Sequence, residues 1–259
     1  MSILEKIILQ KRLEVDRQKE AFGLKDLQQF ERMKRSTVSF KKALKQSEAG
    51  IIAEFKRKSP SKGFIHPDAN PEIIVPGYEA AGAAAVSVLT DTEFFGGSLS
   101  DLKKARECVK LPLLRKDFVI DEYQIYQAKA MGADFILLIA AVLNPATVKQ
   151  FALLAKQIGL ETLLEIHDES ELECICNEVD VVGVNNRNLK TFVTDVNTSF
   201  ELGEKIPSRF VKISESGISD PNTVKELRGA GFDGFLMGEN FMKENDPAKA
   251  LRDFIKKLK

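Results

Sequence analysis

The sequence predicts an α/β fold, a (β/α)8 TIM barrel of eight parallel strands with a helical extension at its N-terminus. From Ile51 onward, β-branched or apolar runs alternate strictly with helix-like segments. The runs are apolar throughout, as in parallel strands that are covered on both faces. The length of 259 residues also matches the roughly 250 residues of one such barrel.

An open, doubly wound sheet is the structural alternative to the barrel. That fold normally carries a glycine-rich turn after its first strand, and the pattern G-x-G-x-x-G is absent. No low-complexity tract or linker rich in Pro, Gly and Ser interrupts the alternation. We therefore expect residues 1–259 to form a single domain, of which residues 1–48 are the N-terminal extension.

The extension is expected to be helical. Leu4, Ile7, Ile8 and Leu13 recur near helical spacing among charged residues, which predicts an amphipathic helix that must cover another surface. The three expected helices span residues 3–19, 24–35 and 39–46.

The barrel elements follow in order. After the first strand, which begins at Ile51, strands are expected at residues 85–89, 111–115, 135–139, 161–166, 181–184, 210–213 and 234–237. The helices between them are expected at residues 69–81, 100–108, 121–131, 145–157, 170–177, 198–205 and 221–229. Several open on N-cap residues, such as Asp121, Asn144 before Pro145, and Asp220 before Pro221.

Composition excludes several classes of function. The 38 basic residues balance 38 acidic ones, so no overall field would gather nucleic acid or an anionic membrane surface, and any anion must be bound locally. The chain has neither a secretory signal nor an apolar run of about 18 residues, so we expect a cytoplasmic protein. Cys108, Cys174 and Cys176, with His66 and His167 isolated, are typical of reduced, partly buried thiols rather than a metal site.

The first strand delivers charge to one face of the sheet. Because side chains alternate along a strand, Glu54 and Lys56 share the face that becomes the barrel interior. A structural ion pair is the simpler interpretation. The loop that follows favours a binding site, since Lys58, Ser59 and Lys62 could all face an anion.

Polar residues also follow the later strands, where a barrel places its active site. Each of these residues has a simple structural explanation when taken alone: a solvated strand-end lysine, an ion-paired glutamate, an Asx turn or a Ser-Gly turn. These explanations do not account for polar residues after five strands at once. Glycines after the last two strands could instead hold a phosphate through backbone N–H groups. The residues are Lys116, Glu165, Asn185, Arg187 and Ser216, and the glycines are Gly217 and Gly238.

These motifs resemble the indole-3-glycerol phosphate synthase family, and the resemblance spans nearly the whole chain. The opening helix and the segment from Thr90 to Ser98 are similar to that family's N-terminal extension and second barrel loop. The motifs are IAEFKRKSPSKG (52–63), LRKDF (114–118), LE (164–165), GVNNRNL (183–189) and SESGI (214–218).

The resemblance implies a carboxy-lyase of tryptophan biosynthesis. Its reaction closes the ring of 1-(2-carboxyphenylamino)-1-deoxyribulose 5-phosphate, with loss of CO₂ and water, to give indole-3-glycerol phosphate without a cofactor. By similarity, Lys116 is the general acid and Glu165 the base. Lys56 contacts the anionic substrate and is a second candidate acid, and Glu54 orients the lysines.

The resemblance also implies the binding residues. Asn185 and Ser216 hold substrate oxygens, and Arg187 lies near the anthranilate carboxylate. The backbone N–H groups that bind the phosphate belong to Gly217, Gly238 and Glu239. The side chains that pack against the aromatic ring of the substrate are Pro60, Phe95 and Phe118. Glu239 and Asn240 depart from the family, where small hydroxyl residues are frequent. Backbone contacts would make that departure unimportant.

Two other functions remain open from the residues alone. A class I aldolase barrel also uses a strand-end lysine, which forms a Schiff base. A noncatalytic barrel that binds sugar phosphates would keep the glycines but has no need for Lys116 with Glu165. The pKa of Lys116 is not settled, because burial and a second lysine lower it while carboxylates raise it. A monomer or weak homo-oligomer is expected.

Overall fold

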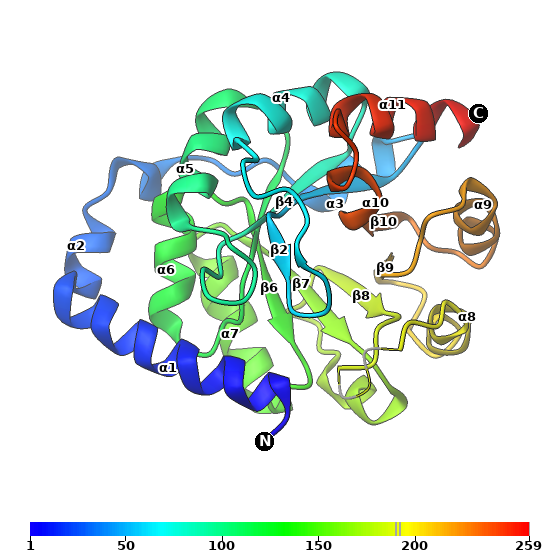
Figure 1. Ribbon diagram of the computed structural model, residues 1–259. Coiled ribbons are helices and arrows are strands. Elements are labelled where there is room, and N and C mark those ends of the chain that lie inside the picture. Colours follow the sequence, from blue (N-terminus) through cyan, green and yellow to red (C-terminus); the bar gives the residue numbers. More distant parts are fainter. Residues whose placement is uncertain (190, 192, 259) are drawn as a thin grey trace.

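The computed structural model describes residues 1–189, 191 and 193–258. Its centre is a closed barrel of eight parallel strands in the order β1-β10-β9-β8-β7-β6-β5-β4 (Figure 1). This confirms the barrel and rules out the open sheet. The strands are β1 (Ile51–Phe55), β4 (Ala85–Leu89), β5 (Leu113–Lys116), β6 (Phe135–Ile139), β7 (Glu161–Ile166), β8 (Val181–Asn185), β9 (Val211–Glu215) and β10 (Gly234–Met237).

Helices surround the barrel and cover its outer face (Figure 1). The segment predicted as a helix at 170–177 is a 3₁₀ helix, η2, and the sequence analysis did not place α10 and α11. The outer elements are α4 (Pro71–Ala81), α5 (Leu99–Cys108), α6 (Glu122–Met131), α7 (Pro145–Gln157), η2 (Glu169–Cys174), α8 (Asn197–Gly203), α9 (Pro221–Gly229), α10 (Glu239–Met242) and α11 (Pro247–Leu258).

The cap residues expected from the sequence do begin these helices. The side chains of Asp121, Asn144 and Asp220 each accept a hydrogen bond from a backbone N–H group of the first helical turn. Each satisfies one of the donors that a helix start leaves unpaired. The caps thus fix where α6, α7 and α9 leave the strand ends.

Strand pleating divides the core in two. Outward residues pack against the helices, and inward residues fill the barrel with apolar side chains such as Ile52, Leu114 and Ile213. Phe40 closes the N-terminal end, since its ring stacks on Phe135 with centroids 3.8 Å apart. The apolar filling leaves room for polar chemistry only at the C-terminal ends of the strands.

The N-terminal extension contains α1 (Ile3–Ala21), α2 (Leu24–Gln28), the 3₁₀ turn η1 (Glu31–Lys34) and α3 (Phe40–Gln46). The helix predicted at 24–35 is therefore two short pieces. The predicted stripe on α1 is partly wrong, because Leu13 is 47% exposed. Ile7 is buried as predicted, and Lys11 and Val15 complete the buried face, with carboxylate partners for the lysine.

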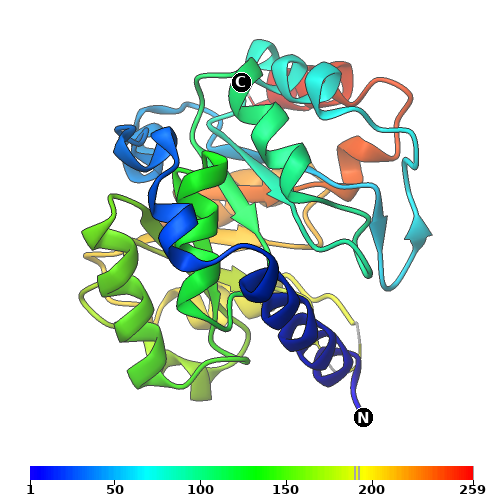
Figure 2. The ribbon, with the colours of Figure 1, turned by 90° about the vertical axis from the view of Figure 1, so that its left-hand side faces the viewer.

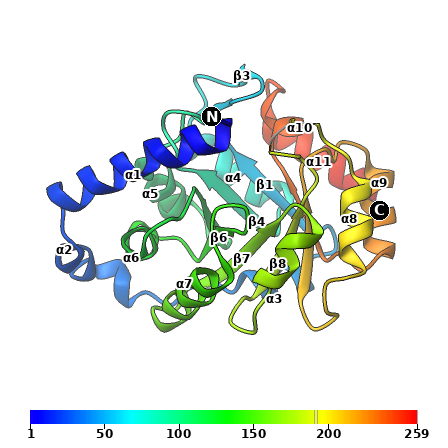
Figure 3. The ribbon, with the colours of Figure 1, turned by 90° about the horizontal axis from the view of Figure 1, so that it is seen from below.

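A short antiparallel hairpin, β2 (Lys58–Ser59) and β3 (Gly63–Phe64), follows β1 and was not predicted. In Figures 2 and 3, this hairpin and the N-terminal end of α1 lie on the same side of the barrel. Both contribute to the rim of one cavity there. None of the helices in the described part of the chain is long and apolar enough to cross a membrane.

The free cysteines differ in exposure. Cys174 is buried and Cys176 partly so, as expected, but Cys108 is exposed. Cys108 is the last residue of α5, where the side chain points away from the packed face formed by Leu102 and Ala105. The expectation that all three thiols are partly buried is therefore wrong for Cys108.

Candidate active site

A cavity of about 630 Å³ opens at the C-terminal ends of the strands. Every strand of the barrel, or the loop after it, contributes to its lining. Of the residues proposed from the sequence, the lining includes Glu54, Lys56, Pro60, Phe95, Lys116, Phe118, Glu165, Asn185, Arg187, Ser216, Gly217, Gly238 and Glu239. Positions up to 185 residues apart in the chain therefore meet at one place, as barrel geometry requires.

Lys58 and Ser59 are the proposed residues that do not line the cavity, and Lys58 Nζ donates to the Glu93 carbonyl at 2.9 Å instead. The Ser59 side chain is buried and its Oγ has no hydrogen-bond partner in the described chain. Ser59 pairs with Gly63 across the hairpin, and the residues of the turn between them, Pro60, Ser61 and Lys62, line the cavity instead. The expected anion contact of Ser59 is therefore not part of this arrangement.

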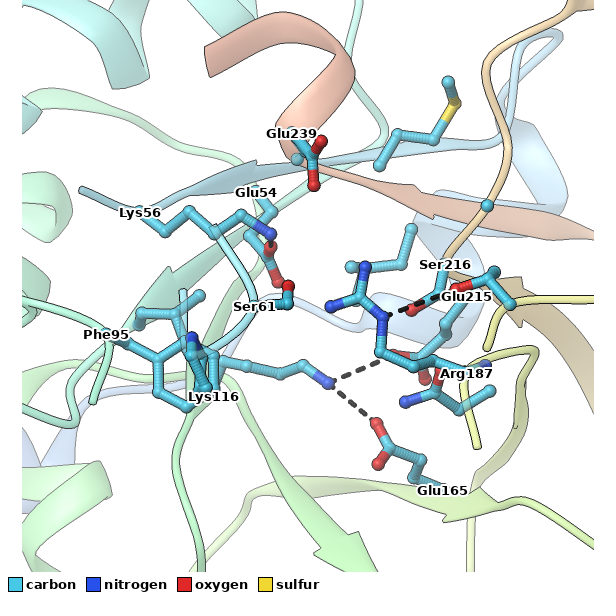
Figure 4. Close-up of a pocket in the computed structure, with 18 of the residues that line it drawn as sticks. Glu54, Lys56, Ser61, Phe95, Lys116, Glu165, Arg187, Glu215, Ser216 and Glu239 are labelled. Carbon is cyan, nitrogen blue, oxygen red and sulfur yellow. Dashed lines mark hydrogen bonds and ion pairs between the residues drawn. The ribbon is translucent and has the colours of Figure 1, made fainter. Parts of the chain in front are cut away.

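Lys116 lies at the end of β5 with its ammonium group between two carboxylates (Figure 4). Its Nζ donates to Glu165 Oε2 at 2.8 Å and to Glu215 Oε2 at 3.1 Å. The lysine side chain is 13% exposed, and those of the glutamates 4% and 1%. Neither β7 nor β9 is a neighbour of β5, so closure of the barrel is what brings these side chains together.

The charges in this cluster set its protonation. Burial lowers the pKa of Lys116, but Glu165, Glu215 and Glu54 outweigh burial and raise it above its ordinary value. Burial raises the pKa of Glu165, but Lys116 and His167 bring it below the usual range. Burial raises the pKa of Glu215; Lys116 lowers it and Glu165 raises it, which leaves it at about 7. Glu215 therefore exchanges a proton near neutral pH.

Glu54 and Lys56 form a second pair, with Nζ 2.6 Å from Glu54 Oε1. They share the inward face of β1, as the alternation predicts. Gly238, on the neighbouring strand's end, provides the space for this carboxylate, because a Cβ there would collide with Glu54 Oε1. Gly183 does the same on β8, where a Cβ would collide with Glu215 Oε1.

The loops after β8 and β9 are tied together around the cavity. Asn186 donates through Nδ2 to Ser214 Oγ and to the Ser216 carbonyl, both at 3.0 Å. Ser216, with φ of 67°, is the one non-glycine residue of the described chain in the left-handed region, and Gly217 follows with φ of 74°. Such a strained turn at a cavity is typical of a functional site.

Part of the cavity wall is apolar and aromatic. Phe95 and Phe118 lie with ring centroids 6.2 Å apart at an interplanar angle of 39°. Leu89, Leu137 and Leu236, on β4, β6 and β10, add to the apolar lining. A cavity with an aromatic wall and a charged face suits a ligand that combines an aromatic ring with anionic groups.

Sequence reasoning gave no role to two residues of the cluster. Glu215 lay inside a quoted motif, and its inward position on β9 follows from the same alternation that placed Glu165. His167 was considered only as an isolated metal ligand. Its spacing of two residues from Glu165 was the signal that could have placed it near that carboxylate.

Comparisons with known sequences agree on one family. The sequence model described as indole-3-glycerol phosphate synthase matches residues 4–254. A protein of that name from Bacteroides thetaiotaomicron is 54% identical over 256 residues, which cover 99% of this chain and 98% of the relative. One from Laribacter hongkongensis is 44% identical over 255 residues, covering 96% and 97%.

Solved structures support the fold. The chain is similar to 3-hexulose-6-phosphate synthase from Salmonella typhimurium, with a TM-score of 0.63 and 13% identity, over 81% of this chain and 100% of that one. The tryptophan synthase complex from Pyrococcus furiosus gives 0.59 and 16%, over 82% and 98%. At such low identity the likeness shows the barrel alone.

Proposed function

The chain belongs to the indole-3-glycerol phosphate synthase family, and from that premise we propose that the cavity at the strand ends is its active site. The protein is a carboxy-lyase of tryptophan biosynthesis. It converts 1-(2-carboxyphenylamino)-1-deoxyribulose 5-phosphate to indole-3-glycerol phosphate, and CO₂ and water leave as the ring closes.

The position of Lys116 between two carboxylates is the observation that carries the assignment. Ring closure needs a proton at the substrate carbonyl, and the departing hydroxyl needs another. Lys116 faces the cavity and is charged in the free protein, so it is the general acid of our proposal. Glu165 stays ionised beside it and serves as the base.

Glu215 adds a group that the sequence analysis left without a role. Its pKa of about 7 matches the requirement that an acid–base catalyst titrates near its working pH. Lys116 is a weak acid by comparison, since the surrounding carboxylates raise its pKa. Glu215 can return a proton to Lys116 through their 3.1 Å contact once the lysine has donated.

The remaining residues of the cavity bind the anionic groups and the ring of the substrate. We assign its carboxylate to Arg187 and Lys56, with Glu54 orienting Lys56 through their 2.6 Å pair. Asn185 and Ser216 hold substrate oxygens. The phosphate belongs at Gly217, Gly238 and Glu239, where backbone N–H groups supply the contacts, and the aromatic ring lies against Pro60, Phe95 and Phe118.

The direct test is incubation with the carboxyphenylamino-deoxyribulose phosphate while indole fluorescence is followed. We expect fluorescence to rise with turnover, and inorganic phosphate to compete with the substrate. A flat signal from folded protein would exclude this activity. Borohydride with a ketose phosphate serves as the counter-test, because covalent trapping would indicate a Schiff-base aldolase. The cytoplasmic location and the monomeric or weakly oligomeric state stay predictions.

A further inference from the structure

Glu165 lies between two cations, of which only one faces the cavity. Its Oε2 accepts from Lys116 Nζ at 2.8 Å. Its other oxygen, Oε1, lies 3.2 Å from Nε2 of His167. The histidine side chain is 8% exposed and is not part of the cavity lining. His167 therefore reaches the substrate pocket only through Glu165.

A second carboxylate holds the far side of the imidazole ring. Nδ1 of His167 lies 3.2 Å from Glu171 Oε2, and the same oxygen accepts from the backbone N–H of His167 at 2.7 Å. Each ring nitrogen thus lies 3.2 Å from a carboxylate oxygen, and the Nε2 contact is an ion pair without hydrogen-bond geometry. A carboxylate on each side of the ring favours a proton on both nitrogens. Burial lowers the pKa of His167, but Glu165 and Glu171 raise it to about 10.

Other titratable groups lie on η2, α7 and α8. Cys174 on η2 stays a neutral thiol, because burial raises its pKa. Asp168 pairs with Ser170, Glu169 with Lys205, and Lys149 with Glu178, and Glu173, Lys156 and Glu201 also lie on η2, α7 and α8. Glu165 and Glu171 are the charged groups in contact with the His167 ring, each at 3.2 Å.

The result is a row of alternating charges from the cavity to the surface helix, in the order Glu215, Lys116, Glu165, His167, Glu171. Glu165 has a cation on each side, whereas Glu215 has only Lys116, and its Oε1 has no hydrogen-bond partner within the described chain. When the two glutamates compete for a proton, Glu165 is the one held ionised.

We propose that His167 is a positioning residue for the reaction: as a buried imidazolium it keeps Glu165 ionised and aimed at Lys116, and it leaves Glu215 as the carboxylate that exchanges a proton. The proposal rests on the function assigned above, since it needs Lys116 and Glu165 to act on the substrate. It identifies a residue outside the pocket that sets the protonation inside it.

A spectroscopic test needs no activity. The chain has two histidines, so ¹⁵N NMR of the imidazoles gives two titrations, and His66→Gln identifies them. His66 contacts the Met242 carbonyl and does not line the cavity. We expect the His167 ring to keep both protons from pH 6 to about 9. Titration of His167 near its ordinary value of 6.5 would overturn the proposal.

A kinetic test separates charge from structure. His167→Gln removes the cation, so the pKa values of both Glu165 and Glu215 rise. The limbs of the kcat/KM profile that report these carboxylates should move to higher pH by about 1–3 units, with KM at the optimum nearly unchanged. His167→Lys restores a cation and should move the limbs back. His66→Gln is the matched control and should leave the profile unchanged.

The outcomes are distinct. Profiles of the Gln and Lys variants that coincide with that of the wild type after scaling would show that the histidine only supports the fold, and would overturn the proposal. If both variants unfold, the NMR titration of the intact protein still decides it. Absence of indole formation by wild-type protein would remove the proposed function, whatever the state of the His167 ring.

Discussion

Two buried lysines lie at the end of β5 and differ in their surroundings. One is Lys116, the last residue of the strand, and the other is Lys11, which contacts the next residue, Asp117. Lys116 points into the cavity toward Glu165 and Glu215. Lys11 reaches from α1 to the next residue, Asp117, at 2.9 Å, and to Asp91 at 3.0 Å. The Lys11 side chain is 1% exposed and does not itself line the cavity, although its partner Asp117 does, whereas Lys116 is 13% exposed and open to a ligand.

The two clusters differ in charge balance as well as in access. Asp117 has both Lys11 and Arg115 as partners; burial raises its pKa, but Arg115 and Lys11 bring it down to about 2. Glu215 shares its one cation with Glu165, and its pKa stays near 7. A buried lysine with carboxylates is therefore not by itself catalytic. The inner cluster, Lys116 with Glu165 and Glu215, has more carboxylates than cations and borders an open cavity, so it is able to move protons.

The largest expected effect comes from substitutions in the inner cluster. Lys116→Met keeps the length and apolar stem but removes the acid, so kcat should fall about 10²–10⁴-fold while KM changes less. Glu165→Gln should fall by a similar factor, and the double variant should lose less than the product of the two, because both serve one proton transfer. Steady-state kinetics with the carboxyphenylamino substrate measures all three. Near wild-type kcat in Lys116→Met would transfer the acid role to Lys56.

The matching change in the outer cluster, Lys11 with Asp91 and Asp117, should affect stability instead. Lys11→Met leaves Asp91 and Asp117 buried with one cation fewer, which should cost about 3–5 kcal/mol of unfolding free energy. Denaturant unfolding measures the loss, and assays below the unfolding range should find most of kcat retained. A fall in kcat as large as that of Lys116→Met, with stability unchanged, would show that the two lysines do not divide the work in this way.

A smaller effect is expected at the slot beside Glu54. Gly238→Ala places a Cβ against Glu54 Oε1, so the pair with Lys56 must shift. We expect kcat/KM to fall about 10²-fold through both constants. A site that serves only the phosphate would raise KM alone. Gly229→Ala is the matched control, since a Cβ there meets nothing within 4 Å.

The smallest expected effect concerns pH and stability. The folded pKa of Glu215, about 7, lies above its ordinary 4.5, so its contribution to stability is present below pH 4.5 and is lost as pH rises through 7. Glu215→Gln should therefore match wild type near pH 4 and exceed its unfolding free energy by about 1–3 kcal/mol above pH 7. Thermal unfolding across that range measures the difference. Equal stability at every pH would contradict the raised pKa.

Sequence reasoning reached the barrel and most of the cavity for the same physical reason. Alternation along strands places Glu54, Lys56 and Glu165 inward, and parallel strands bring their C-terminal ends together. The position of Ser59 could not be read this way, because an unpredicted hairpin sets its direction. Part of the buried face of α1 was missed, because Lys11 looks like a surface residue until Asp91 and Asp117 contact it from distant loops.

The two clusters at the end of β5 have different roles: the carboxylates around Lys116 exchange protons, and Asp117 with Lys11 stabilises the fold. The most direct measurement is a ¹³C NMR titration of the carboxyl groups in the free protein, with Glu215→Gln and Asp117→Asn assigning the two signals. We predict a midpoint near 7 for Glu215 and near 2 for Asp117. Midpoints for both close to the ordinary values of 4.5 and 3.8 would contradict the account.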